Sequence, residues 1–398
     1  MPFSAGINYG ASGDLGAVNK DGRLPQNFLL ASGGEAKSIQ LTLGRRNVMK
    51  RFTKVTIGMF LVFMVGATCV HAFDVKPVKL KFASKFASPW AEHDIAWTYI
   101  DKPVWDKVSR MTNGKIRVTT HFMSSLYPPD KCWDSTLMGV SDITTGFVGF
   151  DSPGRFPISD LFAVLRMDKR PLRISMMGYE MLHNWPETKR EFKGAKMLWL
   201  NAQSALWFGS TKKPILSVKD FKGLKVPAPS RWQGRILEKL GMIPVPIPFP
   251  DIFMALEKGV VDAMLVDPNL IVKYKFGEVI KYVTDIDFGA GTSYGAMNIN
   301  SWKKLPREVQ AVVEKMYYGR ERILEIDTNL IVNHYEMIME AQKTFGTEFF
   351  EFSPEEMEKL VKTVKPVRDE YAAFLDSKGY NGKEILERFD KLTSTYSY

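Results

Sequence analysis

Apolar and polar positions alternate along most of the chain in a way that separates strands from helices. Val78–Ser84, Lys115–Phe122 and Asp142–Phe150 follow the two-residue period of strands. Helical spacing fills the intervals between them, at 89–109 and at 130–138. Because strands and helices follow one another in regular order, we predict an α/β fold with a parallel sheet.

A second series of this kind runs from Pro214 to Asn269. Leu224–Val226 and Ile243–Ile247 are short strands on either side of a helix at Trp232–Leu240, and Val260–Val266 has the composition of a buried parallel strand. In open α/β sheets, ligands bind beyond the carboxyl ends of the strands. The loops that follow residues 226 and 266 are therefore candidate binding loops.

The C-terminal part of the chain is predicted to be helical. Apolar residues recur near the helical period from Leu305 to Ala341, which predicts one long helix. Ser353 to Glu356 form a capping box that opens a further helix, extending to about Leu375.

Arg231 is the candidate with the most specific chemistry. It stands between a strand and the start of a helix, where unpaired N–H groups and the helix dipole favour an anion. Its planar guanidinium adds two parallel hydrogen bonds to a carboxylate. An exposed arginine that contacts only water is the alternative.

The N-terminal segment does not have the pattern of a folded domain. Residues 1–48 are rich in small and polar residues and are predicted to be disordered or to precede the true start. Residues 49–72 have the charged end, apolar core and small-residue cleavage site of a signal peptide, so the mature chain would begin at Phe73. Arg45 and Arg46 leave the twin-arginine route open, although the strong apolar core favours general secretion. The apolar stretch is too short for a convincing membrane span, which needs about 20 residues.

Charge and cysteine content narrow the functional classes. The chain of 398 residues carries a net charge of +10, but residues 1–72 hold eight of its 54 basic and three of its 44 acidic residues, which leaves +5 for the remainder. That mild excess, without a dense basic run, gives no case for nucleic-acid binding. Only Cys132 follows the signal segment, so no intrachain disulfide is expected, and we predict Cys132 to be buried.

Several motifs together resemble one known family. Asp220-Phe-Lys-Gly-Leu-Lys-Val-Pro-Ala-Pro-Ser-Arg231, Leu240-Gly-Met-Ile-Pro-Val-Pro-Ile-Pro and Ala255-Leu-Glu-Lys-Gly-Val-Val-Asp262 occur in that order, after Phe147-Val-Gly-Phe-Asp-Ser-Pro-Gly-Arg-Phe-Pro157. These blocks resemble the periplasmic solute-binding subunits of TRAP (tripartite ATP-independent periplasmic) transporters. The resemblance covers roughly residues 78–345 well and the remaining tail loosely.

The resemblance implies a two-lobed fold of the periplasmic-binding-protein kind, with mixed, mostly parallel sheets, a cleft between the lobes and long C-terminal helices bridging both. Lobe I would contain residues 73–203 and about 295–335, and lobe II residues 204–294 and about 336–398. The implied function is capture of a small organic anion, such as a carboxylate, keto acid or sulfonate, in the periplasm and its delivery to the membrane subunits by a monomer. No cofactor, metal or nucleic acid is expected.

The candidate ligand-binding residues lie on segments that this fold would bring to the cleft. They are Arg231, Trp207, Phe208, Thr144, Thr145, Phe147, Phe150, Arg155, Trp232, Asp267, Asn269, Trp90 and His93.

The chain departs from the family pattern at the position that most concerns the ligand. Many members carry an arginine two residues after the lysine of Gly-Leu-Lys, and this chain has Pro227 there. Arg231 matches a second arginine found in one branch of the family. Asp267 would disfavour an anion unless it orients Arg231 or meets a hydroxyl or an amine. The identity of the ligand is therefore open.

Two other classes remain as alternatives. A secreted α/β hydrolase or lyase would need a nucleophile or base held by a partner residue, and no such motif occurs. The chain is therefore predicted not to be an enzyme. A ligand-sensing partner of a signalling receptor would share the fold.

Overall fold

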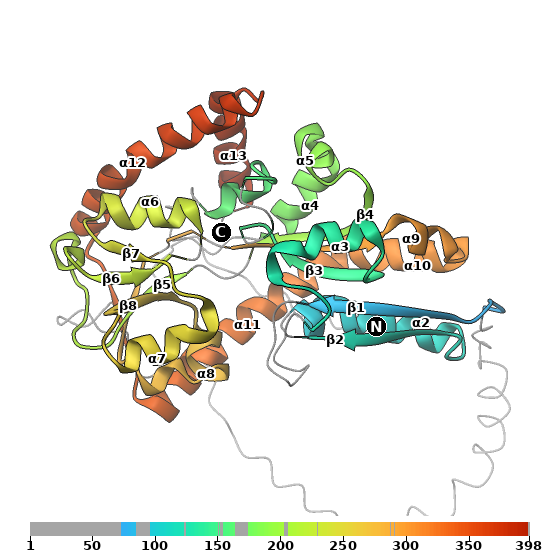
Figure 1. Cartoon of the computed structure of the whole chain (residues 1–398), viewed down its shortest axis with the longest axis horizontal. Helices are drawn as coiled ribbons and strands as arrows, with labels where there is room; N and C mark the ends of the chain where they lie inside the picture. The colour runs from blue at the N-terminus through green and yellow to red at the C-terminus, as the bar shows by residue number, and fades with distance from the viewer. Residues whose placement is uncertain are drawn as a thin grey trace, which may run out of the picture.

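A computed structural model describes residues 73–84, 96–122, 125–149, 151, 154–163, 174–202, 206–228, 230–286, 288–289 and 291–396. The leader and signal peptide predicted from the sequence lie outside these ranges. None of the helices in the described ranges combines the length and the apolar character needed to cross a membrane. Figure 1 shows two groups of strands and helices, here called the first lobe and the second lobe.

The first lobe contains a five-stranded sheet in the order β2-β1-β3-β10-β4. β1 pairs in parallel with both β2 and β3, which confirms the parallel arrangement predicted from the alternation of strands and helices. β10 returns from the second lobe and lies antiparallel between β3 and β4. The strands are β1 (Val78–Ser84), β2 (Ile116–His121), β3 (Ile143–Phe147), β4 (Ala195–Ala202) and β10 (Thr292–Asn298).

The second lobe contains a four-stranded sheet in the order β11-β9-β5-β8 and a two-stranded parallel sheet of β6 and β7. The prediction that Val260–Val266 forms a parallel strand was wrong, because β8 runs antiparallel to β5. Every residue of β8 is buried, and an apolar run indicates burial without revealing the direction of the neighbouring strand. The strands are β5 (Trp207–Ser210), β6 (Lys225–Pro227), β7 (Ile243–Val245), β8 (Ala263–Val266), β9 (Tyr282–Asp285) and β11 (Glu348–Glu351).

Helices pack around the sheets of both lobes (Figure 1). Those of the first lobe are the π-helical turn η2 (Ala96–Asp101), α2 (Lys102–Met111), η3 (Pro129–Lys131), α3 (Cys132–Met138), η4 (Ser159–Ala163), α4 (Ile174–Asn184), α5 (Pro186–Glu191), α9 (Ile299–Lys304) and α10 (Arg307–Tyr318). Those of the second lobe are η5 (Val218–Phe221), α6 (Arg231–Lys239), η6 (Phe249–Asp251), α7 (Ile252–Glu257), α8 (Pro268–Lys273) and η7 (Phe276–Glu278).

Three C-terminal helices link the lobes: α11 (Arg320–Phe345), α12 (Pro354–Ser377) and α13 (Gly382–Tyr396). The single helix predicted from Leu305 to Ala341 is instead divided between α10 and α11, with a break at Gly319, whose ψ of 123° is extended. Apolar periodicity survives such a break, so the sequence pattern did not reveal it. α12 begins at the predicted Ser353 cap, whose hydroxyl accepts a hydrogen bond from the Glu356 N–H.

The apolar cores explain how the lobes are held together. One core lies in the first lobe and includes Ile326 of α11, and another lies in the second lobe and includes Ala341 of the same helix. The largest core is shared, because it contains Tyr294 of the first sheet, Phe208 of the second sheet and Tyr371 of α12. The helix α11 and the shared core therefore connect the two lobes.

Candidate functional site

The N-terminus of α6 is the part of the molecule that best fits the predicted anion site. Ser230 caps the helix, and its hydroxyl accepts a hydrogen bond from the Gln233 N–H at 3.3 Å. Arg231 is the first helical residue, and its side chain is exposed. Among the residues that the structure describes, no carboxylate forms an ion pair with Arg231, whereas Arg235, one turn further along, pairs with both Glu238 and Glu370.

Aromatic rings hold the Arg231 side chain in place. Its guanidinium carbon lies 5.2 Å from the centre of the Trp232 ring and 5.8 Å from that of Phe374 in α12. The Trp232 ring in turn packs against Tyr371 and Phe374, with centre-to-centre distances of 4.6 Å and 5.3 Å. Such cation–π contacts orient a guanidinium while leaving its N–H donors free for another partner.

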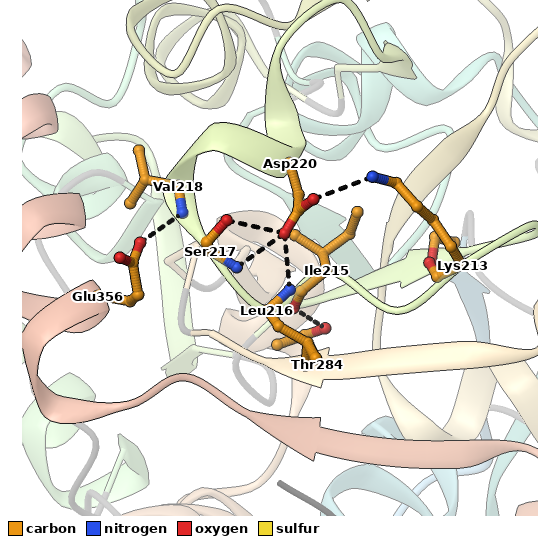
Figure 2. A network of polar contacts seen from close by, with 9 residues as sticks. Lys213, Ile215, Leu216, Ser217, Val218, Asp220, Thr284 and Glu356 are labelled. Atoms are coloured by element: carbon orange, nitrogen blue, oxygen red, sulfur yellow. Dashed lines mark hydrogen bonds and ion pairs between the residues drawn. The ribbon is translucent and has the colours of Figure 1, made fainter. Parts of the chain in front are cut away.

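A polar network fixes the segment that leads into β6 and α6 (Figure 2). One carboxylate oxygen of Asp220 accepts hydrogen bonds from the Ser217 N–H, the Ser217 hydroxyl and the Leu216 N–H, and the other pairs with Lys213 at 2.9 Å. Glu356 of α12 accepts a hydrogen bond from the Val218 N–H at 2.8 Å. Burial opposes ionisation, but the bonds from Lys213 and Ser217 hold the pKa of Asp220 below its usual value.

The loop that follows β3 brings the first lobe to the same corner. A Cβ atom built on Gly149 would lie 3.4 Å from the Cβ of Ser230, and one built on Gly154 would lie 3.4 Å from Cζ of Phe374. The N-terminus of α6 is thus in contact with both the first lobe and the C-terminal helix α12.

The predicted residues of β3 are buried. Thr144 belongs to a cluster of hydroxyls, with Oγ1 2.6 Å from Ser141 Oγ, 2.7 Å from Thr136 Oγ1 and 3.0 Å from Tyr127 Oη. Thr145 lies on the opposite face of the sheet and donates to the Asp101 carboxylate at 3.4 Å. Phe147 ends the strand, and Cε1 of its ring is 3.2 Å from the Cβ position of Gly149.

The predicted residues of β5 pack inside the second lobe. The Trp207 ring lies 4.9 Å from that of His334 and 6.0 Å from that of Phe349. Phe208 packs against Phe221 at 5.0 Å within the shared core. The rings next to Arg231 are instead those of Trp232 and Phe374.

Asp267 and Asn269 have structural partners. Asp267 caps α8 by accepting hydrogen bonds from the Asn269 and Leu270 N–H groups at 2.7 Å and 3.0 Å. Burial raises the pKa of the Asp267 carboxyl despite these bonds. The Asn269 side chain accepts from the Asn333 amide at 2.8 Å, which joins α8 to α11.

Arg155, the other arginine candidate, forms an ion pair with Asp134 at 2.7 Å. Trp90, His93 and Phe150 lie outside the described residues, so their predicted roles stay predictions. Within the described part of the chain, no group of three or more His, Cys, Asp or Glu residues is placed to hold a metal ion. Cys132 is fully buried, as predicted.

The structure adds residues that the sequence did not single out. Asp151 is buried at the start of α3, where its carboxylate accepts from the Trp133 N–H at 2.8 Å and from the Tyr294 hydroxyl. Burial raises the pKa of Asp151 to about 6. Phe374 lies 143 residues after Arg231 in the sequence, and Tyr294 lies 143 residues after Asp151. No local sequence pattern could have connected the two members of either pair.

Comparison with known proteins places the fold and the motifs in one group. The family model described as bacterial extracellular solute-binding protein, family 7, matches residues 86–373. The C4-dicarboxylate-binding periplasmic protein of Rhodobacter capsulatus is 26% identical over 332 residues, covering 78% of this chain and 92% of that protein.

Solved structures are similar over the same part of the chain. A TRAP solute-binding protein from a marine metagenome, specific for aromatic acids, has a TM-score of 0.73 at 23% identity. The match covers 81% of this chain and 100% of that chain. A TRAP solute-binding protein from Rhodoferax ferrireducens, in complex with benzoate, has a TM-score of 0.71 at 24% identity over 80% of this chain and 98% of that chain. These similarities confirm the resemblance stated from the motifs and the two-lobed fold.

Proposed function

The chain belongs to the bacterial extracellular solute-binding proteins of family 7, and on that basis we propose that it captures a small organic anion between its two lobes. Arg231 is the proposed anchor for the charged group of the ligand. The observation that carries this proposal is a guanidinium that pairs with no carboxylate among the described residues, at the N-terminus of α6, where the β3 loop meets α6 and α12.

The chemistry of this corner suits a carboxylate. The first N–H groups of a helix and the helix dipole attract a negative charge, and a guanidinium adds two parallel charge-assisted hydrogen bonds. Arg231 thus takes the role of the arginine that is absent at Pro227. The names of the similar proteins agree with such a ligand, because they include binders of benzoate, mandelate, orotic acid and C4-dicarboxylates.

The proposal includes the route of the protein and of its ligand. Residues 49–72 act as the signal peptide, the mature protein works in the periplasm as a monomer, and it hands its ligand to TRAP membrane subunits. The lobes are those predicted above, with the ligand enclosed as they close. A secreted hydrolase or lyase is not favoured, because the matching family and the similar proteins bind solutes.

Ligand binding is tested first on the wild-type protein. Thermal unfolding with a panel of carboxylates, keto acids and sulfonates should reveal a ligand, because binding to the native state raises the unfolding midpoint. A panel without any shift would contradict the binding function.

The role of Arg231 is tested with the ligand so found, by isothermal titration calorimetry. If closure of the lobes removes water from the bound charge, Arg231→Ala should weaken binding by about 2–5 kcal/mol, by analogy with buried charge pairs at interfaces. Arg231→Lys should weaken binding less, because a point charge keeps attraction but not the planar fork. Arg235→Ala is the matched control on the same helix, since that arginine already pairs with Glu238 and Glu370. Unchanged affinity in Arg231→Ala would move the anchor elsewhere, with Arg155 as the next candidate.

A further inference from the structure

A row of polar side chains crosses the edge of the first sheet that faces the second lobe. β1, β3 and β4 run parallel and end at this edge, and β10 begins there. The pairing of Ser84 with Thr145 and of Ser293 with Asn201, together with the two-residue alternation of side chains along β3 and β10, puts all four on the same face.

On β1 and β3, the polar side chains of this row already interact with other residues of the protein. Thr145 donates to Asp101, a fully buried carboxylate that also accepts hydrogen bonds from Trp199 Nε1 at 3.0 Å and from the Tyr317 hydroxyl at 2.6 Å. These contacts fix the Asp101 carboxyl on this face of the sheet. Its partner Trp199 stands two residues before Asn201 on β4.

The other half of the row has polar atoms without a partner. Asn201 Oδ1 and Ser293 Oγ accept or donate no hydrogen bond within the described structure, although Asn201 is only 7% exposed and Ser293 only 4%. The hydroxyl of Ser175, at the start of α4, also has no hydrogen-bond partner within the described structure, and Ser175 is only 8% exposed. Buried polar atoms are nearly always paired in native proteins, so these atoms need a partner that the described chain does not supply, such as water or a ligand group.

A small cavity adjoins these atoms. It lies between α4, β4 and the junction of α10 with α11, and Ser175 and Asn201 both line it. Its volume is about 20 Å³, which is room for one oxygen-sized group. The walls are otherwise formed largely by aliphatic and aromatic side chains, which offer little to a charged group.

The position in the chain connects this site with the cleft. Asn201 is the penultimate residue of β4, after which the chain passes to β5 in the second lobe. Ser293 is the second residue of β10, where the chain has just returned from β9. Both residues therefore lie where two segments cross between the lobes.

We propose that Asn201 and Ser293 form a subsite for an uncharged hydroxyl group of the ligand, with Ser175 closing the far side, so that the preferred ligand is a hydroxylated organic acid. This inference rests on the proposed function, in which Arg231 holds the carboxylate. A hydroxyl both donates and accepts, so it can donate to Asn201 Oδ1 and accept from Ser293 Oγ.

The same arrangement argues against a second carboxylate in this place. An ionised carboxylate only accepts hydrogen bonds and would leave Asn201 Oδ1 without a donor. The site should therefore distinguish a hydroxyl from a second acid group.

The test compares pairs of acids that differ in one hydroxyl: benzoate with 3-hydroxybenzoate, phenylacetate with mandelate, and succinate with malate. Dissociation constants are measured by titration calorimetry for the wild type, Asn201→Leu and Ser293→Ala. For at least one pair, the hydroxylated acid should bind the wild type at least about 5- to 10-fold more tightly, because its hydroxyl gains hydrogen bonds to both residues. Each variant removes one of these bonds and should lower that ratio, while changing the affinity for the plain acid less than about 2-fold.

Thr188→Val is the matched control, because Thr188 also carries a buried hydroxyl without a partner, on α5 beyond the far end of α4. It should leave the preference for the hydroxylated acid unchanged. Equal binding of both members of every pair by the wild type, or an equal loss for both members in the variants, would overturn the subsite while leaving Arg231 as anchor. Failure of the wild type to bind any acid would reject the proposed function and this inference together.

Discussion

Replacing Asp151 by asparagine should stabilise the protein above pH 6, by an amount that follows from its burial. Burial raises the pKa of this carboxyl from 3.8 to about 6, so the native state holds the proton more tightly than the unfolded chain does. The favourable contribution of the protonated group is complete below about pH 4 and is lost as the pH rises through 6. A shift of about two pKa units corresponds to about 3 kcal/mol.

Asparagine resembles the protonated carboxyl in shape and charge. It keeps an oxygen that can accept from the Trp133 N–H and the Tyr294 hydroxyl, which are the two donors at this carboxylate. The stability difference between Asp151→Asn and the wild type should therefore be small near pH 4. It should grow to at most about 3 kcal/mol in favour of the variant at pH 7.5.

The assay is urea unfolding of both proteins at several values between pH 4 and pH 8, monitored by circular dichroism and tryptophan fluorescence. Asp220→Asn is a control of opposite sign, because hydrogen bonds from Lys213 and Ser217 outweigh partial burial and lower the pKa of Asp220. The stabilising effect of that carboxylate is present at neutral pH and fades as the pH falls, so its removal should cost most at neutral pH. A destabilised Asp151→Asn whose deficit does not vary with pH would refute the reasoning.

Three further experiments have defined outcomes. Gly178→Ala should lower the free energy of unfolding, measured in urea, by about 3 kcal/mol or more. The new Cβ would lie 1.8 Å from the Leu200 carbonyl oxygen, a backbone atom that cannot rotate away. Near-native stability of the variant would contradict this. Asn333→Ala should cost about 1–3 kcal/mol by leaving the buried Asn269 side chain without its partner, and the double alanine variant should cost less than the two single changes added together. Mass analysis of the exported protein should find Phe73 at its N-terminus, and an intact Met49 would contradict the proposed signal peptide.

Much of the fold could be predicted from local pattern. The two-residue period located β1 and β2, glycines and caps located the ends of α3 and α12, and motif order between Asp220 and Asp262 indicated the family. These features depend on residues close in sequence, whose side chains share a face or cap a helix regardless of the rest of the chain. The direction of β8 and the break at Gly319 were missed because an apolar pattern is compatible with either arrangement.

The candidate site depended much more on contacts between distant segments. The sequence placed Arg231 at a helix start, but only the packing of α12 brought Phe374 against its guanidinium. Thr144 and Thr145 were equal candidates in the sequence. In the structure, Thr144 belongs to a cluster of hydroxyls and Thr145 donates a hydrogen bond to Asp101.

Asn201 and Ser293 are 92 residues apart and have no motif in common, yet strand register makes them neighbours. The sequence by itself determined where strands, helices and their caps lie, since these follow from side-chain periodicity and short-range hydrogen bonds. Which polar atoms are satisfied and which remain open to a ligand was decided only by the tertiary structure, because each hydrogen-bond partner comes from another element.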